Sequence, residues 1–538
     1  MTDPLTVSFD NIGATVPSYR VTDSTGAAVD LTDLTKFQAT TLRSRPQTGV
    51  DTHSGYTVDY KFPLTTAVPV TVKVGGRVED TTRNISDPVY NRTGNTVATG
   101  FGGTSAITGA KLAGLTDTGF SQHPIGYGLP AYNFVSLYSA FTQLGGMAEV
   151  PYTPASDTQA RFDDTTKAGY VRVDVTPVEH LLVVGGVRYE DRETDAQNRL
   201  TTLPAPVNGK FTDKRFFPSI NLKYSATNNL VFRAGYSKSI GLPDYSDLLP
   251  LTQVTAPNQS TGARGSVKVY NPTLQAYHVD NYDAGVEYYF NKSGYVSASI
   301  FRKTFTNYIA TVTQALTPAG VTQLGLDPST LTSTIDQYDV SYKLNVPEPA
   351  HYNGIEVGFA QNFTFLPKPF NTLGLQVNAT LISVDPINSH VVFSSTDANL
   401  NADLLHQVNK NLEIAAVKQA LNVELNYSIG KFGINIVTNY TGHVLRTGGV
   451  VQKTVQYSDI DPATGKKVLP QYYDELNYQA PRELVDVRID YKWNSRFTPY
   501  FQARNIFARP IVGSTPIEPF NYATYGDPIY EIGVRGIW

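Results

Sequence analysis

The sequence of 538 residues predicts an all-β fold, a transmembrane antiparallel β-barrel of about sixteen strands. Three observations support this prediction. Apolar and polar residues alternate along segments of about ten residues, the length that a tilted strand needs to cross a bilayer. The connections between these segments alternate between short and long. Aromatic residues stand beside the short connections, and together these features are typical of outer-membrane barrels.

Residues 214–238 show the alternation most clearly. In the first half Phe216, Ile220 and Tyr224 share one parity, whereas Asn221 and Lys223 take the other. After a polar turn at 226–229 the alternation resumes over 230–238, so the segment predicts a β-hairpin. Strands of soluble domains usually have about five or six residues, and these are longer. We therefore expect one face toward lipid and one toward water.

The composition agrees with membrane contact. Charged residues make up 17% of the chain, below the roughly 25% of average soluble proteins, and the chain contains 34 Tyr and 25 Phe. A single hydrophobic core stops growing at about 250–300 residues, a limit that a barrel escapes. The sequence has no apolar run of about 18 residues, so it predicts no transmembrane helix.

The expected strands begin with a short one at 4–10 and continue with 53–61 and 68–80. Residues 81–161 are rich in Gly, Thr, Ser and Asn, and we expect a functional or disordered loop there. The pattern is regular from then on, with strands near 171–175, 181–190, 214–225, 230–238, 282–290, 294–300, 355–365, 373–381, 421–429, 432–440, 484–493, 497–507 and 529–538.

Short turns are expected near 62–67, 176–179, 225–228, 291–293, 366–370, 430–431 and 494–496, and long loops separate the hairpins. Outer-membrane barrels have short periplasmic turns and long extracellular loops, so the short turns mark the expected periplasmic side. Seven aromatic residues beside these turns form the expected periplasmic girdle: Phe290, Phe365, Phe370, Tyr427, Phe432, Trp493 and Phe497.

Only a few residues suggest a binding site. The loop aromatics Tyr132, Phe134, Tyr138 and Phe141 are candidate contacts for a sugar or a siderophore, and packing within the loop explains them equally well. Inward-facing polar residues are candidates for a substrate path, although most such residues merely face a wet lumen: Asp283, Glu287, Glu424, Asp486, Arg488 and Asp490.

Several functions are disfavoured. A net charge of −4 and the lack of a concentrated Lys/Arg run argue against a nucleic-acid partner. The eight histidines form no H-E-x-x-H motif, and residues 119–123 lack the context of a nucleophile elbow, so no enzyme activity and no catalytic residue are predicted. Cysteine is absent and the carboxylates are not clustered, so we expect no metal site and no cofactor.

Several stretches resemble the C-terminal barrel of TonB-dependent outer-membrane receptors. The segment FPSINLKYSATNNLVFRAGYSKSIGLPDYSDL at 217–248 is similar to a hairpin of that family. NPTLQAYHVDNYDAGVEYYF at 271–290, GYVSASIFRKTFTNYI at 294–309, YNGIEVGFAQNFTFLP at 352–367, RNIF at 504–507 and YGDPIYEIGVRGIW at 525–538 also fit. Gln275-Ala276 replace a common Lys-Pro. The resemblance covers roughly residues 160–538.

This resemblance implies a receptor of the bacterial outer membrane for a scarce nutrient such as an iron-siderophore, cobalamin or an oligosaccharide. The implied partners are outer-membrane lipid, the barrel-assembly machinery, the TonB complex and the small-molecule nutrient. The family barrel has twenty-two strands and a plug. With about sixteen strands and no recognisable plug, TonB box or signal sequence, residues 1–538 are expected to be one truncated barrel domain that cannot carry out energy-coupled uptake alone.

Glu531, Gly533 and Trp538 resemble the signal by which the barrel-assembly machinery recognises its clients, although Gly536 stands where an apolar residue is usual. Two alternatives to a receptor remain open. A passive porin of sixteen strands encloses an aqueous channel, but such porins usually lack loops this long. A secreted all-β binding protein needs its apolar parity buried against a second sheet.

Overall fold

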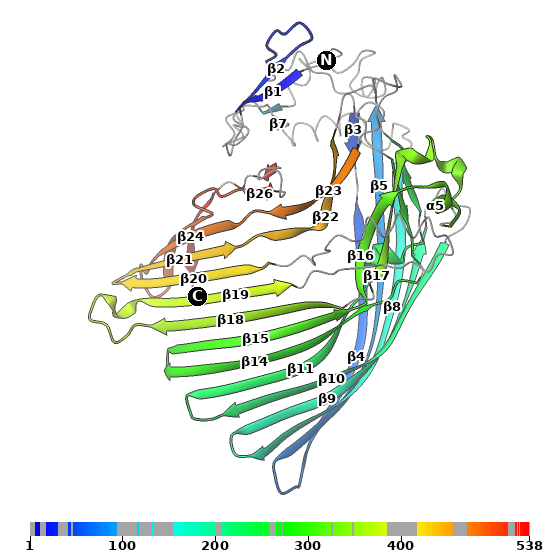
Figure 1. Cartoon of the computed structure of the whole chain (residues 1–538). Helices are drawn as coiled ribbons and strands as arrows, with labels where there is room; N and C mark the ends of the chain where they lie inside the picture. The colour runs from blue at the N-terminus through cyan, green and yellow to red at the C-terminus, as the bar shows by residue number, and fades with distance from the viewer. Residues whose placement is uncertain are drawn as a thin grey trace. The chain divides into compact units, whose positions relative to one another are not determined.

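The computed structural model describes residues 6–10, 18–30, 41–44, 47–93, 116–117, 131–132, 154–199, 207–250, 252–257, 265–271, 273–323, 326–346, 349–384, 417–455, 471–514, 522–524, 526 and 528–536 (Figure 1). The chain divides into two compact units. The first comprises Met1–Asp51, Arg83–Arg161 and Arg199–Pro206, and the second comprises Thr52–Thr82, Phe162–Asn198 and Val207–Trp538.

A large antiparallel sheet dominates the fold, and sixteen strands of the described residues belong to it. The strand order is β28-β25-β24-β21-β20-β19-β18-β15-β14-β11-β10-β9-β8-β5-β3, and β4 also pairs with β5. The strands are β3 (Thr41–Ser44), β4 (Thr48–Leu64), β5 (Val70–Thr93), β8 (Pro154–Val178), β9 (Leu181–Asn198), β10 (Val207–Ser225), β11 (Leu230–Gly241), β14 (Tyr277–Asn291), β15 (Gly294–Thr306), β18 (Ala350–Asn362), β19 (Gly374–Val384), β20 (Gln419–Ile429), β21 (Phe432–Thr441), β24 (Arg482–Tyr491), β25 (Phe497–Arg504) and β28 (Ile529–Gly536).

The predicted all-β fold class with its large antiparallel sheet is confirmed, and every predicted strand after the first overlaps a strand of this sheet. The predicted first strand is wrong in its partner. β1 (Thr6–Asp10) pairs with β2 (Ser18–Thr22) in a separate two-stranded sheet of the first unit, and β3 joins the large sheet by pairing with β5. A five-residue alternation fits pairing with β2 as well as pairing within the large sheet, so the sequence pattern alone does not determine the partner strand.

The expected loop at 81–161 is also partly wrong, because β5 continues to Thr93 and β8 already begins at Pro154. Residues 81–93 are mostly polar on both parities, so the two-residue period disappears although the strand continues. A second small pair in this region joins β6 (Thr116–Asp117) to β7 (Ala131–Tyr132).

The short turns lie where the sequence predicts them, and Figure 1 shows them at one end of the large sheet. Two residues separate β20 from β21, and Gly430 in this turn has a φ of 57°, a left-handed conformation that favours glycine. The turn between β18 and β19 contains the short helix η4 (Phe370–Thr372). Among the expected girdle residues, Phe365 and Trp493 are 71% and 66% exposed.

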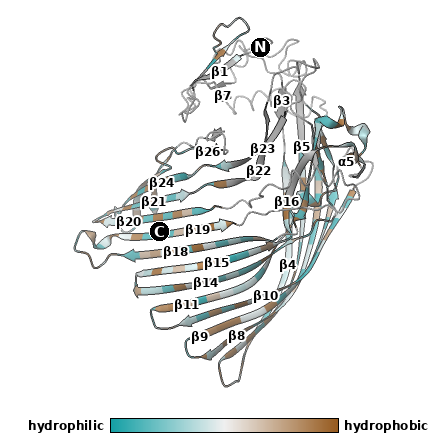
Figure 2. Cartoon of the chain, in the orientation of Figure 1, coloured by the Kyte–Doolittle hydropathy of each residue, from teal (hydrophilic) through white to brown (hydrophobic). Residues whose placement is uncertain are grey.

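One face of the sheet carries a continuous apolar belt within the second unit. The strand registers align Val183, Leu222, Ala234, Ala284, Ile300, Ile355 and Leu381 in one row across seven neighbouring strands. Ile300 and Leu381 are 61% and 57% exposed, so no second layer formed by the described residues covers them. Figure 2 shows hydrophobic and hydrophilic residues alternating along these strands. An exposed apolar surface of this extent is a contact surface for lipid or protein.

Two smaller sheets are built from the long connections of the second unit, which the sequence predicts only as loops. The first has the order β12-β13-β17-β16 and the second the order β22-β23-β26-β27. Their elements, with the adjoining helices, are α4 (Tyr245–Leu248), β12 (Gln253–Thr255), β13 (Gly265–Val269), β16 (Tyr308–Ala315), α5 (Pro318–Gln323), η2 (Pro328–Thr330), η3 (Ile335–Gln337), β17 (Tyr338–Val346), β22 (Val444–Val455), β23 (Gln471–Gln479), β26 (Ile511–Ser514) and β27 (Tyr522–Thr524).

Candidate functional site

The face of the large sheet opposite the belt is polar and carries paired charges. On β11 and β14, Arg233 Nε donates to Glu287 Oε1 at 2.7 Å, and the hydroxyl of Tyr289 donates to Glu287 Oε2 at 2.8 Å. On β8 Arg172 pairs with Asp174, two residues along the same strand and so on the same face. The charged side chains named here on this face are therefore paired with side chains of opposite charge.

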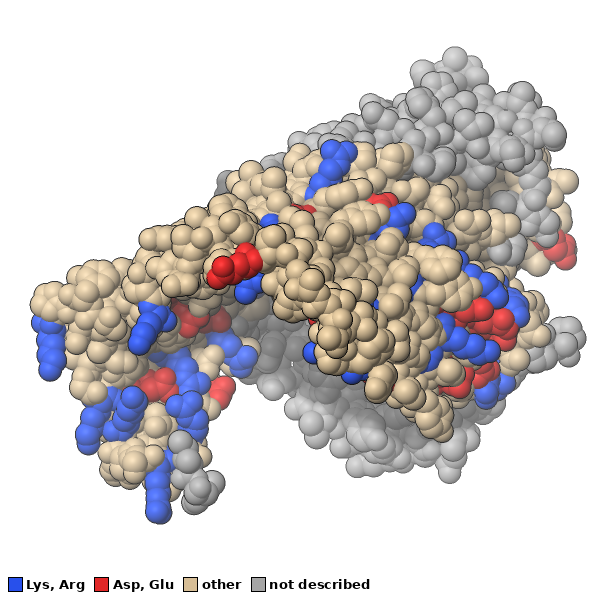
Figure 3. Space-filling model, turned by 90° about the horizontal axis from the view of Figure 1, so that it is seen from below, with Lys and Arg blue, Asp and Glu red and all other residues tan. Residues whose placement is uncertain are grey.

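The same arrangement recurs on the last strands of the sheet. Arg488 Nη2 lies 2.9 Å from Asp490 Oδ1, and the Arg488 guanidinium sits 4.2 Å from the ring centroid of Tyr500. Tyr500 in turn donates its hydroxyl proton to Glu531. Seen from below in Figure 3, basic and acidic side chains are interleaved on the right of the view, whereas basic side chains predominate at the lower left. Exposed pairs of this kind contribute about 0–1 kcal/mol each, so their main effect is a neutral, wettable surface.

The six polar residues proposed for a substrate path all lie on described strands, and five of them form hydrogen bonds or ion pairs on this face. Glu287, Arg488 and Asp490 belong to the pairs above. Glu424 Oε1 accepts from Asn435 Nδ2 at 2.7 Å, and Asp486 Oδ1 accepts from the backbone N–H of Asn505 at 2.8 Å. The sixth is Asp283. The polar face fits a water-filled surface at least as well as a selective path, so the path stays a prediction.

The most site-like structure is a loop platform, which we define as residues 245–274 and 308–346. It joins two connections that are separate in sequence, the one after β11 and the one after β15. Strand β13 of the first connection runs parallel to β17 of the second, from Gly265 opposite Tyr338 to Val269 opposite Tyr342. Because a parallel ladder needs both partners, neither connection forms this sheet alone.

The platform has its own hydrophobic core, built from Val267, Leu316, Val321, Tyr338 and Val340. Val267 and Tyr338 are completely buried. The two parities of β13 and β17 explain the arrangement, since alternate residues face the core and the intervening ones, such as Lys268 and Ser341, face away. The alternation of GSVKV and YDVSYKLNV, of five and nine residues, was present in the sequence, but it does not identify the parallel partner of either strand.

An ion pair links the two connections. Lys343 of β17 donates to Asp247 Oδ2 of α4 at 2.6 Å, and it lies 3.4 Å from Asp244 Oδ2. The Asp247 side chain is only 4% exposed, whereas that of Asp244 is 79% exposed. Burial lowers the pKa of Lys343, but the hydrogen bond to Asp247 and the charges of both carboxylates outweigh it, so the pKa is raised. We call this group of three residues the clamp.

Amide hydrogen bonds tie the same two connections together beside the clamp. The backbone N–H of Gln275 donates to Asn345 Oδ1, and Asn345 Nδ2 donates to the Gln275 carbonyl, both at 2.8 Å. Asn271 Nδ2 donates to the carbonyl of Lys343 at 2.9 Å. These bonds and the parallel ladder make the two connections one folded body.

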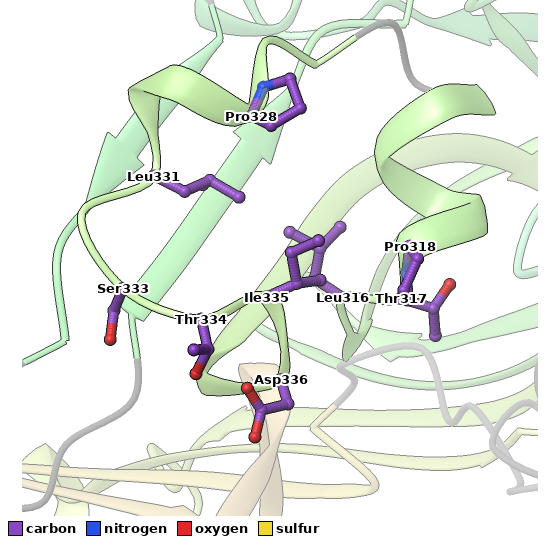
Figure 4. Close-up of a pocket in the computed structure, with 9 residues that line it drawn as sticks. All are labelled: Leu316, Thr317, Pro318, Pro328, Leu331, Ser333, Thr334, Ile335 and Asp336. Atoms are coloured by element: carbon purple, nitrogen blue, oxygen red, sulfur yellow. The ribbon is translucent and has the colours of Figure 1, made fainter.

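Two cavities open on the platform. A cavity of about 600 Å³ is lined by residues of the second connection, which Figure 4 shows around a common space. A smaller cavity of about 190 Å³ lies between α4, β13 and β17, beside the clamp. The larger volume is within the range of roughly 300–1,000 Å³ that ligand pockets occupy.

Comparison with protein families identifies the chain. Residues 3–506 match the family model described as TonB dependent receptor-like, beta-barrel. The chain belongs to this family. TonB-dependent receptors are transporters of the bacterial outer membrane and not enzymes. The sequence prediction of the family is therefore confirmed, although the resemblance had been placed mainly on residues 160–538.

Solved structures show the same fold. The ferric citrate transporter FecA in the unliganded form has a TM-score of 0.53 and 12% identity, and the match covers 93% of this chain and 56% of that chain. The ferric-catecholate import receptor Fiu from K12 E. coli has a TM-score of 0.52 and 11% identity, with 99% and 59% covered. The siderophore receptor PiuA from Acinetobacter baumannii has a TM-score of 0.51 and 11% identity, with 90% and 56% covered.

This TonB-dependent receptor barrel thus spans less than two thirds of the length of the solved receptors that it resembles. A search of curated proteins found no match. Among the helices of the described residues, none is both long and apolar enough to cross a membrane.

Of the four predicted loop aromatics, Tyr132 alone lies within the described residues. Tyr132 ends β7, where its backbone is opposite Thr116. Phe134, Tyr138 and Phe141 lie outside the described residues, so their role in binding stays a prediction. The structure instead draws attention to the loop platform, which no motif in the sequence had indicated.

Two of the three residues of the predicted assembly signal lie on β28. Glu531 accepts the Tyr500 hydrogen bond and lies 3.9 Å from Arg504, while Gly533 is directly opposite Tyr500. A Cβ atom at Gly533 would meet the Tyr500 ring at 2.6 Å, so packing alone explains a glycine here. Trp538 lies outside the described residues. The recognition role of all three residues stays a prediction.

Proposed function

We propose that the chain is the barrel portion of an outer-membrane receptor that takes up a scarce small-molecule nutrient through coupling to the TonB complex. The observation that carries the proposal is the exposed apolar belt on one face of the sheet, opposite a face of compensated charges. A strand that separates lipid from a wet interior needs these two faces.

The nutrient and the partners belong to this proposal rather than to the fold. FecA, Fiu and PiuA are described as receptors or transporters of ferric citrate, ferric catecholate and siderophores, which supports a siderophore over cobalamin or an oligosaccharide. Energy coupling needs a plug and a TonB-contacting segment, and uptake is therefore proposed for the receptor as a whole. Outer-membrane lipid contacts the belt, and the barrel-assembly machinery inserts the chain through β28.

The orientation of the two faces can be tested on neighbouring residues of β20. Val423 lies in a row with Val377 and Thr438 on the belt face, and Asn422 is opposite Asn378 and Asn439 on the polar face. Val423→Arg near the bilayer midplane should lower the free energy of unfolding in lipid by about 2–4 kcal/mol, and Asn422→Arg by much less. Equal losses for the two variants in a reversible unfolding assay contradict the proposed lipid-facing surface.

A passive porin is the second candidate, because the described sheet has the sixteen strands of that class. Uptake separates the two functions. A receptor requires an intact TonB complex for uptake of its nutrient, whereas a porin conducts small solutes equally well in cells without TonB. The third candidate, a secreted binding protein, is disfavoured because Ile300 and Leu381 of the belt are exposed and no second layer formed by the described residues covers them.

A further inference from the structure

The larger cavity of the loop platform has a consistent chemistry. Its apolar lining comes from Leu316 before α5, Pro318 at the start of α5, Pro328 of η2, Leu331 and Ile335 (Figure 4). Leu316 is buried, and Leu331 and Ile335 pack against the platform core. The floor of the cavity is therefore continuous with the folded core.

Polar side chains lie on both flanks of the cavity, and Figure 4 shows Thr317 beside Pro318 on one flank and Ser333 on the other. Two of the hydroxyl groups have partners within the fold, since Thr317 Oγ1 accepts from the backbone N–H of Gly320 at 3.0 Å and Ser333 Oγ donates to Gln337 Oε1. Thr317, Ser333 and Thr334 contribute hydroxyl groups, and Asp336 is the one charged residue among the nine that Figure 4 draws. None of those nine side chains is aromatic or basic. Sugars are usually held by stacking on aromatic rings, and carboxylate-rich chelates need cationic partners, so this lining suits neither.

The platform core and the ladder between β16 and β17 preorganise the cavity. Its residues lie between β16 and β17, which pair along their whole lengths from Tyr308 opposite Val346 to Ala315 opposite Asp339. The hydroxyl of Tyr338 accepts from the backbone N–H of Thr332 at 3.0 Å. This bond fixes the segment between η2 and η3, which contributes residues to the lining of the cavity. A cavity held in this way loses little conformational entropy when it is filled.

We propose that this cavity binds an uncharged aryl or acyl group of the transported nutrient against the apolar side chains of Leu316, Leu331 and Ile335. The inference rests on the proposed function and narrows its substrate class, because it selects nutrients that carry an apolar group. An oligosaccharide or a chelate built only from carboxylates lacks such a group.

Three ferric chelates serve as probes for the full chain reconstituted in lipid nanodiscs. A benzohydroxamate chelate supplies an uncharged aryl group, a hydroxamate with an octanoyl chain supplies an acyl group, and citrate supplies neither. Binding is measured by equilibrium dialysis with radioactive iron. We expect the aryl or the acyl chelate to bind at least tenfold more tightly than ferric citrate.

Two variants locate the binding. Leu331→Asp places a second carboxylate in the cavity and should weaken binding at least tenfold, because burying an unpaired charge is costly. Thr334→Trp fills the exposed side of the cavity without introducing charge, and it should weaken binding comparably even if Leu331→Asp perturbs folding. Thr334 makes no side-chain cap bond to η3, so its replacement is structurally mild.

A matched control uses the same chemistry elsewhere. Gln253→Asp adds one carboxylate to an exposed position of β12, opposite Lys268 and away from the core. This variant should bind within about twofold of the parent chain, because Gln253 does not line the cavity. Unchanged binding in Leu331→Asp and Thr334→Trp, or no preference for either apolar chelate over citrate, overturns the inference.

Uptake measured separately distinguishes this inference from the proposed function. If cells take up a nutrient in a TonB-dependent manner and Thr334→Trp does not weaken its binding, the cavity assignment fails and the receptor function stands. If the cavity binds an apolar chelate but cells that express the complete receptor, with its plug and TonB-contacting segment, show no TonB-dependent uptake, the receptor function fails and the binding site stands.

Discussion

Replacing Asp247 by alanine should loosen the loop platform without affecting the large sheet. Lys343 has two carboxylate partners, but they differ in burial: the side chain of Asp247 is 4% exposed and that of Asp244 is 79% exposed. An exposed ion pair contributes about 0–1 kcal/mol, whereas breaking a fully buried one costs about 3–5 kcal/mol. The Lys343 side chain is 29% exposed, so it can still reach water when Asp247 is lost.

These burial differences predict an order of effects. Asp244→Ala should cost less than 1 kcal/mol and Asp247→Ala about 2–3 kcal/mol, because the stranded ammonium keeps Asp244 and some solvent. Lys343→Met should cost about 3–4 kcal/mol, because it leaves the nearly buried Asp247 carboxylate without a counter-charge. The double variant Asp247→Leu with Lys343→Met removes both charges and should regain most of the loss.

Native-state hydrogen exchange reports this local opening, which global unfolding of the barrel does not resolve. The amides of β13 and β17 should exchange faster in the single variants, while those of β20 and β21 stay unchanged and act as an internal control. Two results refute the reasoning. One is an equal effect of Asp244→Ala and Asp247→Ala, and the other is a double variant as labile as Lys343→Met.

Three further predictions concern charge and the last strand. The pKa of Lys343 is raised above its unfolded value of about 10.4, so the stabilisation by the charged Lys343 is complete below that pH and is lost as the pH rises through the folded pKa. The hydrogen-exchange protection of the platform should therefore fall only in alkaline solution. Lys343→Met should abolish this pH dependence. Gly533→Ala should reduce membrane-inserted protein through its clash with the Tyr500 ring, and Tyr500→Ser should restore it; failure of the rescue favours the assembly-signal role of Gly533 over packing. Removal of residues 537–538 should lower the amount of heat-modifiable, inserted protein, and an unchanged amount contradicts a recognition role for Trp538.

Much of the large sheet could be predicted from the sequence because its physical cause is local. Each membrane-length strand has one face toward an apolar and one toward a polar environment, so apolar and polar residues alternate along segments such as 214–238. The short turns carry equally local signals, for example Gly430 with its positive φ. The family resemblance followed from the same strands. The polar extensions of β5 and β8 were missed because no change of environment marks them.

The loop platform could not be predicted because its causes are not local. β13 has five residues and pairs in parallel with a strand from another connection, and the bonds that select this partner join distant residues, such as Lys343 with Asp247 and Asn345 with Gln275. No window of the sequence contains both members of such a pair.

The direct connection between the platform and the large sheet follows from one residue. A single residue, Asn307, separates the end of β15 from the start of β16, and its φ is 59°. The carbonyl of Asn307 accepts from Asn345 Nδ2 at 2.8 Å, and the same side chain also bonds Gln275. Asn345 thus bonds both to the junction between β15 and β16 and to the connection after β11, so these two hydrogen bonds join the platform directly to the end of a strand of the large sheet.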